Sequence, residues 1–380
     1  MKKTQIFIIL IFVIIISTLC GCFDSDTPKR RAKQEIVIAC GKDETGTLKS
    51  IMNDFTAQSS TTQVKLIELS NESRELYRTI SSMLAGKEVQ LDAMLMEDVW
   101  VSEFANSGYL EPLDNMVSFD DSVYHPRIAD FARNGGKLYW YPMILDTGIM
   151  YYRDDISDGS LDYRQLTEQS DIPYAVQGTD GEEMLCCALE FISLTDSVED
   201  GIRLYKKTID KAAVTNNPVN GLLSGEAVYA RAWTSENSGI AKGYAPAGAN
   251  ISTKVLKNEN GEAYATARAY GFAANAASEK KDSIKELLNY LADDSVQTRI
   301  IKEKGTLPLR REDYENPLIS YYSDYIDSTY PLFETLKFRP NKPDYTHLSR
   351  QAGTALSEYI GGEGTVDAAA EAMSRLLDRQ

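Results

Sequence analysis

The residues of this chain that could do chemistry are mainly carboxylates and aromatic side chains. Only two histidines are present, His125 and His347, and no Cys/His cluster has the spacing of a metal site. Neither a phosphate-binding P-loop nor a nucleophile elbow occurs. Glu97 and Asp146 could form the carboxylate pair of a glycosidase, and the sequence leaves this alternative open. The residue types favour binding over catalysis, and they predict neither a cofactor nor a metal.

The stretch that must position these residues runs from Lys137 to Asp155, with the sequence KLYWYPMILDTGIMYYRDD. Strand-forming residues in Leu138–Leu145 and Ile149–Tyr152 predict a buried strand, which Asp146-Thr147-Gly148 interrupts with residues that are rare in core strands. We therefore expect the chain to change domain here. An acid at such a crossing would face a cleft between two lobes, where it could accept hydrogen bonds from a ligand. The alternative is that Asp146 caps a turn.

At 380 residues the chain is too long for one compact core and long enough for two domains. The first part alternates strand and helix patterns, with strands expected over Glu35–Cys40 and Gln63–Leu69 and helices over Thr47–Gln58 and Glu72–Ala85. This order predicts a mainly parallel sheet whose strand-end loops face a cleft. Lys42 and Asp43 lie in the first of these loops and are candidate ligand contacts.

The first residues have the pattern of an export signal. Lys2 and Lys3 precede an apolar run, Ile6–Ile16, which is too short to span a bilayer and is followed by small residues. Leu19-Cys20-Gly21-Cys22 resembles a bacterial lipobox, which predicts cleavage after residue 21 and a lipid-modified Cys22. We expect residues 1–21 to be a lipoprotein signal peptide and residues 22–34 a tether. The mature protein would then be anchored on the outer side of a bacterial cell membrane.

Loss of residues 1–21 would remove two lysines and no acid, which takes the formal charge from −16 to −18. A surface this acidic argues against nucleic acid and against flat binding to anionic lipid. With Cys22 lipidated, three thiols remain, so no complete disulfide framework is available. Cys186 and Cys187 are expected to be small core residues, and the alternative is a strained disulfide between these neighbours.

Several segments resemble one known family. The segment Pro142–Asp155 is similar to the inter-lobe segment of extracellular solute-binding proteins of ABC sugar importers, the maltose-binding-protein-like family and in particular its trehalose/maltose-binding branch. Leu91–Asp114 shares the family's order of strand, acid, Trp, helix and Gly-x-Leu-x-Pro-Leu. Gly221–Ser235 resembles its helix end, Ser-Gly turn, strand and tryptophan. One departure is Arg268-Ala269, which stands where relatives carry Gly-Gly.

The resemblance implies an α/β, two-lobed periplasmic-binding-protein-like fold. Each lobe would be a mainly parallel sheet flanked by helices, with the ligand cleft between the lobes. The first lobe would comprise residues 35–145 and 268–310, and the second residues 146–267 and 311–380.

The same resemblance implies ligand-binding residues. Trp233 would stack on a sugar ring while carboxylates accept hydrogen bonds from sugar hydroxyls. Glu97 is the expected ligand-facing acid, with Asp98 beside it, although both could instead cap a helix. The further candidates are Trp100, Asp146, Tyr174, Gln177 and Tyr345. Without the resemblance, Trp233 would be assigned to the core.

The implied function is capture of a carbohydrate, such as an oligosaccharide or α-glucoside, by hinge closure and its delivery to membrane permease subunits. The protein would be a monomer and not an enzyme. Two other ligands remain as alternatives. A polyamine would suit the acidity of the chain, and ferric iron could be held by adjacent tyrosines such as Tyr151-Tyr152 or Tyr321-Tyr322.

Overall fold

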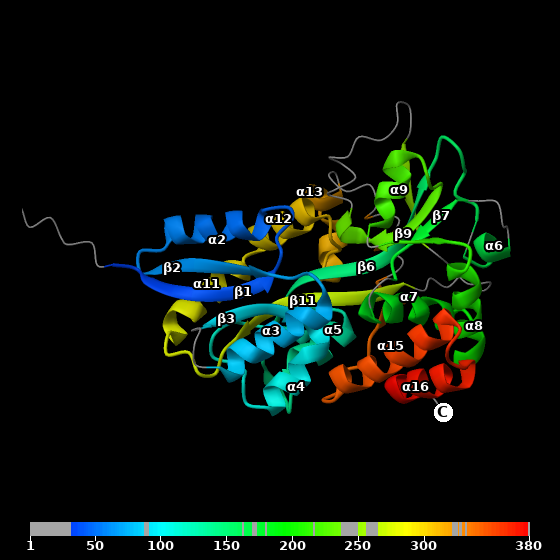
Figure 1. Ribbon diagram of the computed structural model, residues 1–380. Coiled ribbons are helices and arrows are strands. Elements are labelled where there is room, and N and C mark those ends of the chain that lie inside the picture. Colours follow the sequence, from blue (N-terminus) through cyan, green and yellow to red (C-terminus); the bar gives the residue numbers. More distant parts are fainter. Residues whose placement is uncertain are drawn as a thin grey trace, which may run out of the picture.

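Strand β6 (Tyr141–Arg153) runs through the middle of the molecule and carries a set of strands and helices on each of its two halves (Figure 1). The computed structural model describes residues 32–86, 91–161, 163–168, 173–178, 181–215, 217–236, 250–255, 265–320, 326, 329–330 and 333–378. Residues Tyr141 to Tyr151 are all buried, which confirms the predicted buried strand. Asp146 lies within β6, so the alternative that it caps a turn is wrong.

The first lobe is built on β1 (Gln34–Gly41), which pairs in parallel with β2 (Thr62–Leu69) and β3 (Ala93–Glu97). The antiparallel strand β11 (Thr266–Ala274) follows β3 and joins it to β6. The main helices of this lobe are α2 (Thr47–Gln58), α3 (Ser73–Ala85), α4 (Val101–Asn106), α5 (Pro126–Ala132), α11 (Lys281–Leu291) and α12 (Asp294–Lys304).

The second lobe begins where β6 leaves β11 and pairs with β9 (Tyr229–Trp233) from Gly148 onward. Beyond β9 lie β7 (Tyr174–Val176) and β8 (Ala213–Val214), while β10 (Ile251–Lys254) pairs with the end of β6. Its helices are α6 (Tyr163–Glu168), α7 (Gly181–Ser193), α8 (Val198–Ile209), α9 (Pro218–Ser224), α15 (Tyr345–Gly361) and α16 (Val366–Leu377). Helices α15 and α16 lie beside α7 and α8 (Figure 1).

The two-lobed α/β fold is as expected, but its sheet differs from the expectation of one mainly parallel sheet per lobe. A single mixed sheet continues through both lobes in the order β2-β1-β3-β11-β6-β9-β7-β8, with β12 (Lys337–Phe338) beside β11. The pairs that β6 and β11 make with each other and with β3, β9 and β10 are antiparallel. The parallel pattern was inferred from the opening segment, where it holds.

Helix α2 shows how the apolar pattern specifies the local structure. Its buried residues Leu48, Ile51, Met52 and Phe55 recur every three or four positions and face the sheet. Asp43 fixes the beginning of the helix, because its carboxylate accepts a hydrogen bond from the Lys49 backbone N–H at 2.9 Å.

The predicted lobe boundaries remain predictions. The short segments η4 (Arg311–Glu315) and α13 (Pro317–Ser320) follow α12. Phe333 and Phe338 pack against His125, with ring centroids 5.3 and 5.0 Å apart, and so link the chain after residue 310 to the region of α5.

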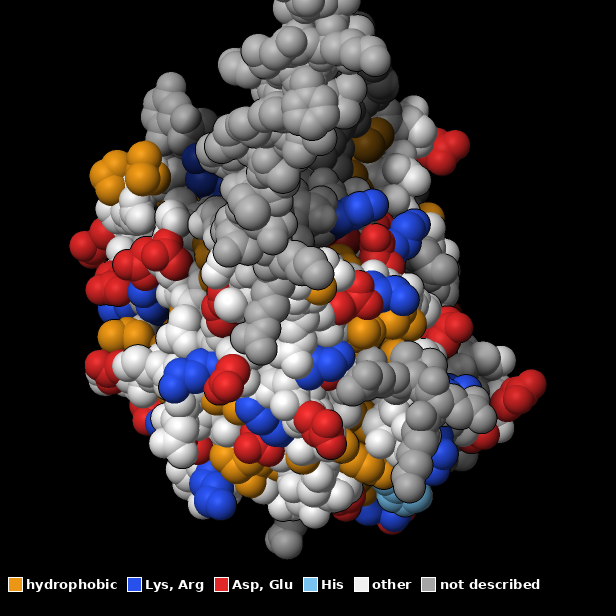
Figure 2. Space-filling view, turned by 90° about the vertical axis from the view of Figure 1, so that its left-hand side faces the viewer, with side chains coloured by type: hydrophobic (Ala, Val, Ile, Leu, Met, Phe, Trp, Pro, Cys, Tyr) orange, Lys and Arg blue, Asp and Glu red, His pale blue; other side chains and the backbone are white. Residues whose placement is uncertain are grey.

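Among the described residues, no helix is long and apolar enough to cross a membrane. The predicted signal peptide and Cys22 lie outside those residues. On the face shown in Figure 2, acidic and basic side chains are interspersed, with no extended area of one sign.

Cys186 and Cys187 are buried in α7 with free thiols. The expectation that they are core residues is confirmed, and the alternative of a disulfide between them is wrong. Burial raises the pKa of the Cys186 thiol, so this thiol stays protonated and unreactive.

Gly148 makes room for a buried ion pair rather than for a turn. The Arg231 guanidinium and the Glu190 carboxylate meet at 2.6 Å with side chains that are 0% and 1% exposed, and a Cβ at Gly148 would collide with both. We predict that Gly148→Ala lowers the free energy of unfolding by about 2–4 kcal/mol. Gly361→Ala is the control, because no atom lies within 4 Å of its added Cβ. Urea unfolding of both variants checks this, and equal stabilities would contradict it.

Candidate functional site

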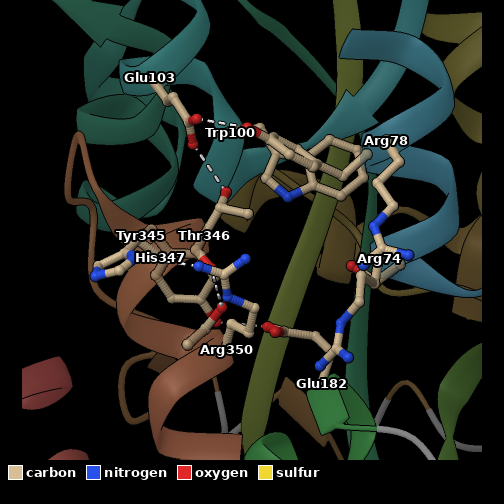
Figure 3. Close-up of a pocket in the computed structure, with 12 residues that line it drawn as sticks. Arg74, Arg78, Trp100, Glu103, Glu182, Tyr345, Thr346, His347 and Arg350 are labelled. Atoms are coloured by element: carbon tan, nitrogen blue, oxygen red, sulfur yellow. Dashed lines mark hydrogen bonds between the residues drawn. The ribbon is translucent and has the colours of Figure 1, made fainter. Parts of the chain in front are cut away.

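A pocket of about 250 Å³ lies between the two lobes (Figure 3). One wall comes from α3 and from the segment η1 (Asp98–Trp100) with α4, and the opposite wall from the beginnings of α7 and α15. The lining residues are Ser73, Arg74, Tyr77, Arg78, Trp100, Glu103, Glu182, Tyr345, Thr346, His347, Ser349 and Arg350. The structure therefore brings two predicted site residues, Trp100 and Tyr345, into one pocket.

Aromatic side chains form the first-lobe wall of the pocket. The rings of Tyr77 and Trp100 meet edge to face, with centroids 5.6 Å apart, and Phe104 stacks behind Tyr77 at 5.5 Å. Burial, together with the hydrogen bond to Glu103, raises the pKa of Tyr77 to about 12. Tyr77 therefore stays protonated and donates its hydroxyl hydrogen to Glu103.

Two carboxylates link the walls. Glu103 of α4 also accepts a hydrogen bond from the Thr346 hydroxyl of α15 at 2.8 Å. Glu182 of α7 accepts one from the Tyr345 hydroxyl at 2.5 Å. Both acids of the pocket are thus engaged with neighbouring side chains.

Behind the pocket lies an ion-pair cluster at the lobe junction, which we call the junction cluster: Arg268 and Arg339 with Glu97, Asp98, Asp146, Glu182 and Glu183. Arg339 is 1% exposed and contacts Glu97 at 2.6 Å, Asp98 at 2.8 Å and Glu182 at 2.8 Å. One buried guanidinium thus joins acids at the end of β3 to an acid of the second lobe.

Asp98 is fully buried, with a side chain that is 0% exposed. Its pKa is raised to about 6. Burial is the main cause, Arg339 opposes it, and the nearby Glu97 contributes to the increase. Its carboxylate also accepts hydrogen bonds from the backbone N–H groups of Val99 and Ala269, so it fixes the beginning of η1.

Asp146 joins β6 to the end of β9. Its carboxylate accepts hydrogen bonds from the Thr234 hydroxyl at 2.7 Å, from the Ser235 backbone N–H at 2.9 Å and from the Ser235 hydroxyl at 2.8 Å. It also pairs with Arg268 at 3.1 Å. These bonds occupy the acceptor capacity that was expected to serve a ligand.

Trp233 is covered in this structure. The guanidinium carbon of Arg268 lies 3.8 Å from the centroid of the ring, that of Arg231 lies 4.4 Å from it, and the residue is 1% exposed. Its indole N–H donates to Glu183 at 2.6 Å. A sugar would therefore have to displace Arg268 before it could stack on this ring.

The other predicted site residues are placed as follows. Lys42 is exposed beside Glu44 at 3.8 Å, and Asp43 caps α2 and pairs with Lys304 at 3.3 Å. Tyr174 is buried in β7, and the Gln177 side-chain oxygen accepts from Arg231 at 3.4 Å. The ligand-binding roles of all predicted site residues remain predictions.

The sequence reasoning did not identify the arginines of the site. Arg268 was noted only as a departure from Gly-Gly, although an arginine replacing glycine beside expected acids was a usable signal. Arg74, Arg78, Arg339 and Arg350 carried no local signal, because their importance depends on contacts between distant segments.

A model of the bacterial extracellular solute-binding protein family matches residues 41–298. The chain belongs to this family. This confirms the expected resemblance, and the trehalose/maltose-binding branch remains a prediction.

Individual relatives agree with this assignment. A probable ABC transporter-binding protein of Deinococcus radiodurans is 21% identical over 330 residues, covering 76% of this chain and 78% of that protein. The structure of maltose-bound T. maritima MalE3 has a TM-score of 0.78 at 19% identity and covers 90% of this chain and 99% of its own. That of the GacH receptor of Streptomyces glaucescens has a TM-score of 0.78 at 20% identity and covers 92% and 100%. At these identities the two structures show the fold of this solute-binding protein.

Glu236, in η3 (Thr234–Glu236), makes the stability of the folded protein depend on pH. Burial raises its pKa to about 7, and the carboxylates of Asp146, Glu44 and Glu183 add to this effect while Arg268 opposes it. Because the folded-state pKa lies above the ordinary glutamate value of 4.5, the resulting stabilisation is complete below about pH 4.5 and is lost as the pH rises through about 7.

We predict that Glu236→Gln reduces the loss of stability between pH 5 and pH 8 by about 1–2 kcal/mol. Chemical unfolding of the wild type and the variant at both pH values measures this difference. Glu226→Gln is a control with the same charge change at an exposed acid. Parallel pH profiles of Glu236→Gln and the wild type would contradict the prediction.

Proposed function

We propose that this solute-binding protein captures a carbohydrate in the pocket between its lobes and delivers it to the membrane permease subunits of an ABC importer. The observation that carries the proposal is the composition of the pocket. Tyr77 on the first-lobe wall is partly exposed and offers aromatic surface, with the buried Trp100 packed against it, and the arginines offer hydrogen-bond donors. Sugars present C–H faces and hydroxyl groups, so they require both kinds of side chain.

The relatives support the same ligand class. T. maritima MalE3 was solved with maltose, and the GacH receptor was solved in complex with acarbose and an acarbose homologue. The pocket volume of about 250 Å³ is small for a ligand site, since such sites are about 300–1,000 Å³, and this favours a short saccharide.

The alternatives are less consistent with the contacts. Glu97 and Asp146, the suggested glycosidase pair, are both held by arginines, as are the acids that a polyamine would need. Tyr151, one of the suggested iron ligands, is 0% exposed and donates its hydroxyl hydrogen to the Trp233 carbonyl. Tyr321-Tyr322 lies outside the described residues. Among the described residues, no group of three or more His, Cys, Asp or Glu side chains could hold a metal ion.

Capture would proceed by closure of the lobes about the strands that cross between them. The pocket is lined from both lobes, so a bound sugar contacts both walls and favours the closed arrangement over an open one. The protein acts as a monomer in this proposal.

We expect calorimetry to detect binding of a mono- or oligosaccharide, accompanied by a smaller radius of gyration in solution scattering. Tyr77→Ala should weaken that binding by about 1–3 kcal/mol, in analogy to the loss of other aromatic stacking surfaces. Tyr359→Ala, at a half-buried tyrosine of α15 outside the pocket, is the control. Absence of binding across a broad panel of saccharides would overturn the proposed function.

The proposal includes a lipid anchor at Cys22, which would keep the protein beside its permease. Acyl chains contribute about 0.8 kcal/mol per buried methylene, so two or three chains hold a protein firmly on a membrane. Cys22→Ser should therefore move the protein from the membrane fraction to the soluble fraction. Mass spectrometry of native material should find the chain beginning at a diacylglyceryl Cys22, and an unmodified Cys22 thiol would refute this part.

A further inference from the structure

Three arginines of the pocket stand apart from the others in the described part of the chain. Arg74, Arg78 and Arg350 line the pocket, and none has a carboxylate within 4.0 Å among the described residues. Each of the other arginines whose side chain is described contacts a carboxylate: Arg127, Arg133, Arg153, Arg203, Arg231, Arg268, Arg299, Arg310, Arg311, Arg339 and Arg375. In a chain of net charge −16, the described arginines that lack a carboxylate partner thus gather at one place.

These arginines come from opposite sides of the pocket. Arg74 and Arg78 extend from α3 and Arg350 from α15 (Figure 3). The Arg74 guanidinium reaches across to the second lobe, where it lies against Gly181 at the beginning of α7. The charges are thus distributed around the space in which a ligand would lie.

The two acids of the pocket form no ion pair with these three arginines. Glu182 is bound by Arg339 and by the Tyr345 hydroxyl. Glu103 accepts hydrogen bonds from the hydroxyls of Tyr77 and Thr346. Glu103 and Glu182 line the same pocket, but neither lies within 4.0 Å of Arg74, Arg78 or Arg350. The three guanidinium groups therefore have no direct carboxylate partner among the described residues, and an anion between them would be stabilised.

The guanidinium group selects for oxyanions. Its planar fork of N–H donors matches the two oxygens of a carboxylate or of a sulfate or phosphate group, and such charge-assisted hydrogen bonds are stronger than neutral ones. The partly exposed ring of Tyr77, supported by the buried Trp100, supplies the surface for a sugar ring beside that group.

We propose that the carbohydrate captured by this protein is anionic, with a carboxylate, sulfate or phosphate group held among Arg74, Arg78 and Arg350. This inference rests on the proposed function and specifies its ligand class. The acids of the junction cluster stay paired with arginines while the ligand binds the unpaired ones.

Calorimetry with matched pairs of ligands tests the inference. Galacturonate oligomers are compared with their methyl esters to test for recognition of a carboxylate. A sulfated disaccharide is compared with its desulfated form to test for a sulfate, and trehalose 6-phosphate with trehalose to test for a phosphate. We expect one charged member to bind at least 10-fold more tightly than its neutral counterpart, with an affinity that falls as salt increases.

Arg78→Gln and Arg350→Gln should each weaken binding of that charged ligand by about 10- to 100-fold. Their melting temperatures should stay the same or rise, because each variant removes an unpaired like charge. Arg203→Gln is the control, since it makes the same charge change at an exposed arginine of α8 that is paired with Glu199 and lies outside the pocket.

The outcomes separate this inference from the proposed function. Tight binding of neutral sugars that the arginine variants leave unchanged would overturn the anionic ligand and leave carbohydrate capture intact. Binding of inorganic sulfate or phosphate without any saccharide, or binding of a polyamine, would contradict both. Loss of affinity in Arg203→Gln equal to that in Arg78→Gln would also overturn the inference, because the effect would then reflect net charge alone.

Discussion

The arrangement of the lobes depends on the compensation of buried carboxylates by Arg339. Glu97 and Asp98 end a strand of the first lobe, Glu182 begins a helix of the second, and all three meet one guanidinium that is 1% exposed. Removal of one partner from a buried ion pair typically costs about 3–5 kcal/mol, because the remaining charge is left without compensation. Without this cation, three acids from two lobes would repel one another across the junction.

This compensation also determines which surfaces a solute can reach. Arg268 pairs with Asp146 and Glu183 and covers Trp233, so the residues that resemble a sugar site in the sequence lie within the protein. The accessible space is displaced toward α3 and α15, where aromatic rings and unpaired arginines face each other. Glu182 belongs to both the junction cluster and the pocket. Acids outnumber arginines in the junction cluster, whereas arginines outnumber acids in the pocket.

The elements could be predicted well where their pattern is local. The predicted bounds of α2, Thr47–Gln58, agree with the structure because its apolar residues follow the helical period. The burial of β6 was predictable because strand-forming residues occupy most of it. The continuation of the strand through Asp146 was not predictable, because it depends on pairing with Arg268 in β11, which is far away in the sequence.

The site was predictable only in part for the same reason. Trp100 and Tyr345 were proposed from the family resemblance and do line the pocket. The unpaired state of Arg74, Arg78 and Arg350 has no sequence signature, because an arginine on a helix surface has the same local pattern whether or not an acid from another segment reaches it. The covering of Trp233 likewise requires knowledge of where Arg268 and Arg231 lie.

The continuity of the sheet restricts how the two lobes can move. β6 pairs with β11 as far as Thr147 and with β9 from Gly148, so the crossing itself is hydrogen-bonded backbone rather than loop. A rotation that broke these bonds would expose buried N–H and C=O groups. The lobes are therefore joined by hydrogen-bonded antiparallel strands. These strands can increase or decrease their twist while the hydrogen bonds between them are kept. Amide protons at this crossing should consequently exchange slowly with solvent in every lobe arrangement, so that movement of the lobes occurs without local unfolding.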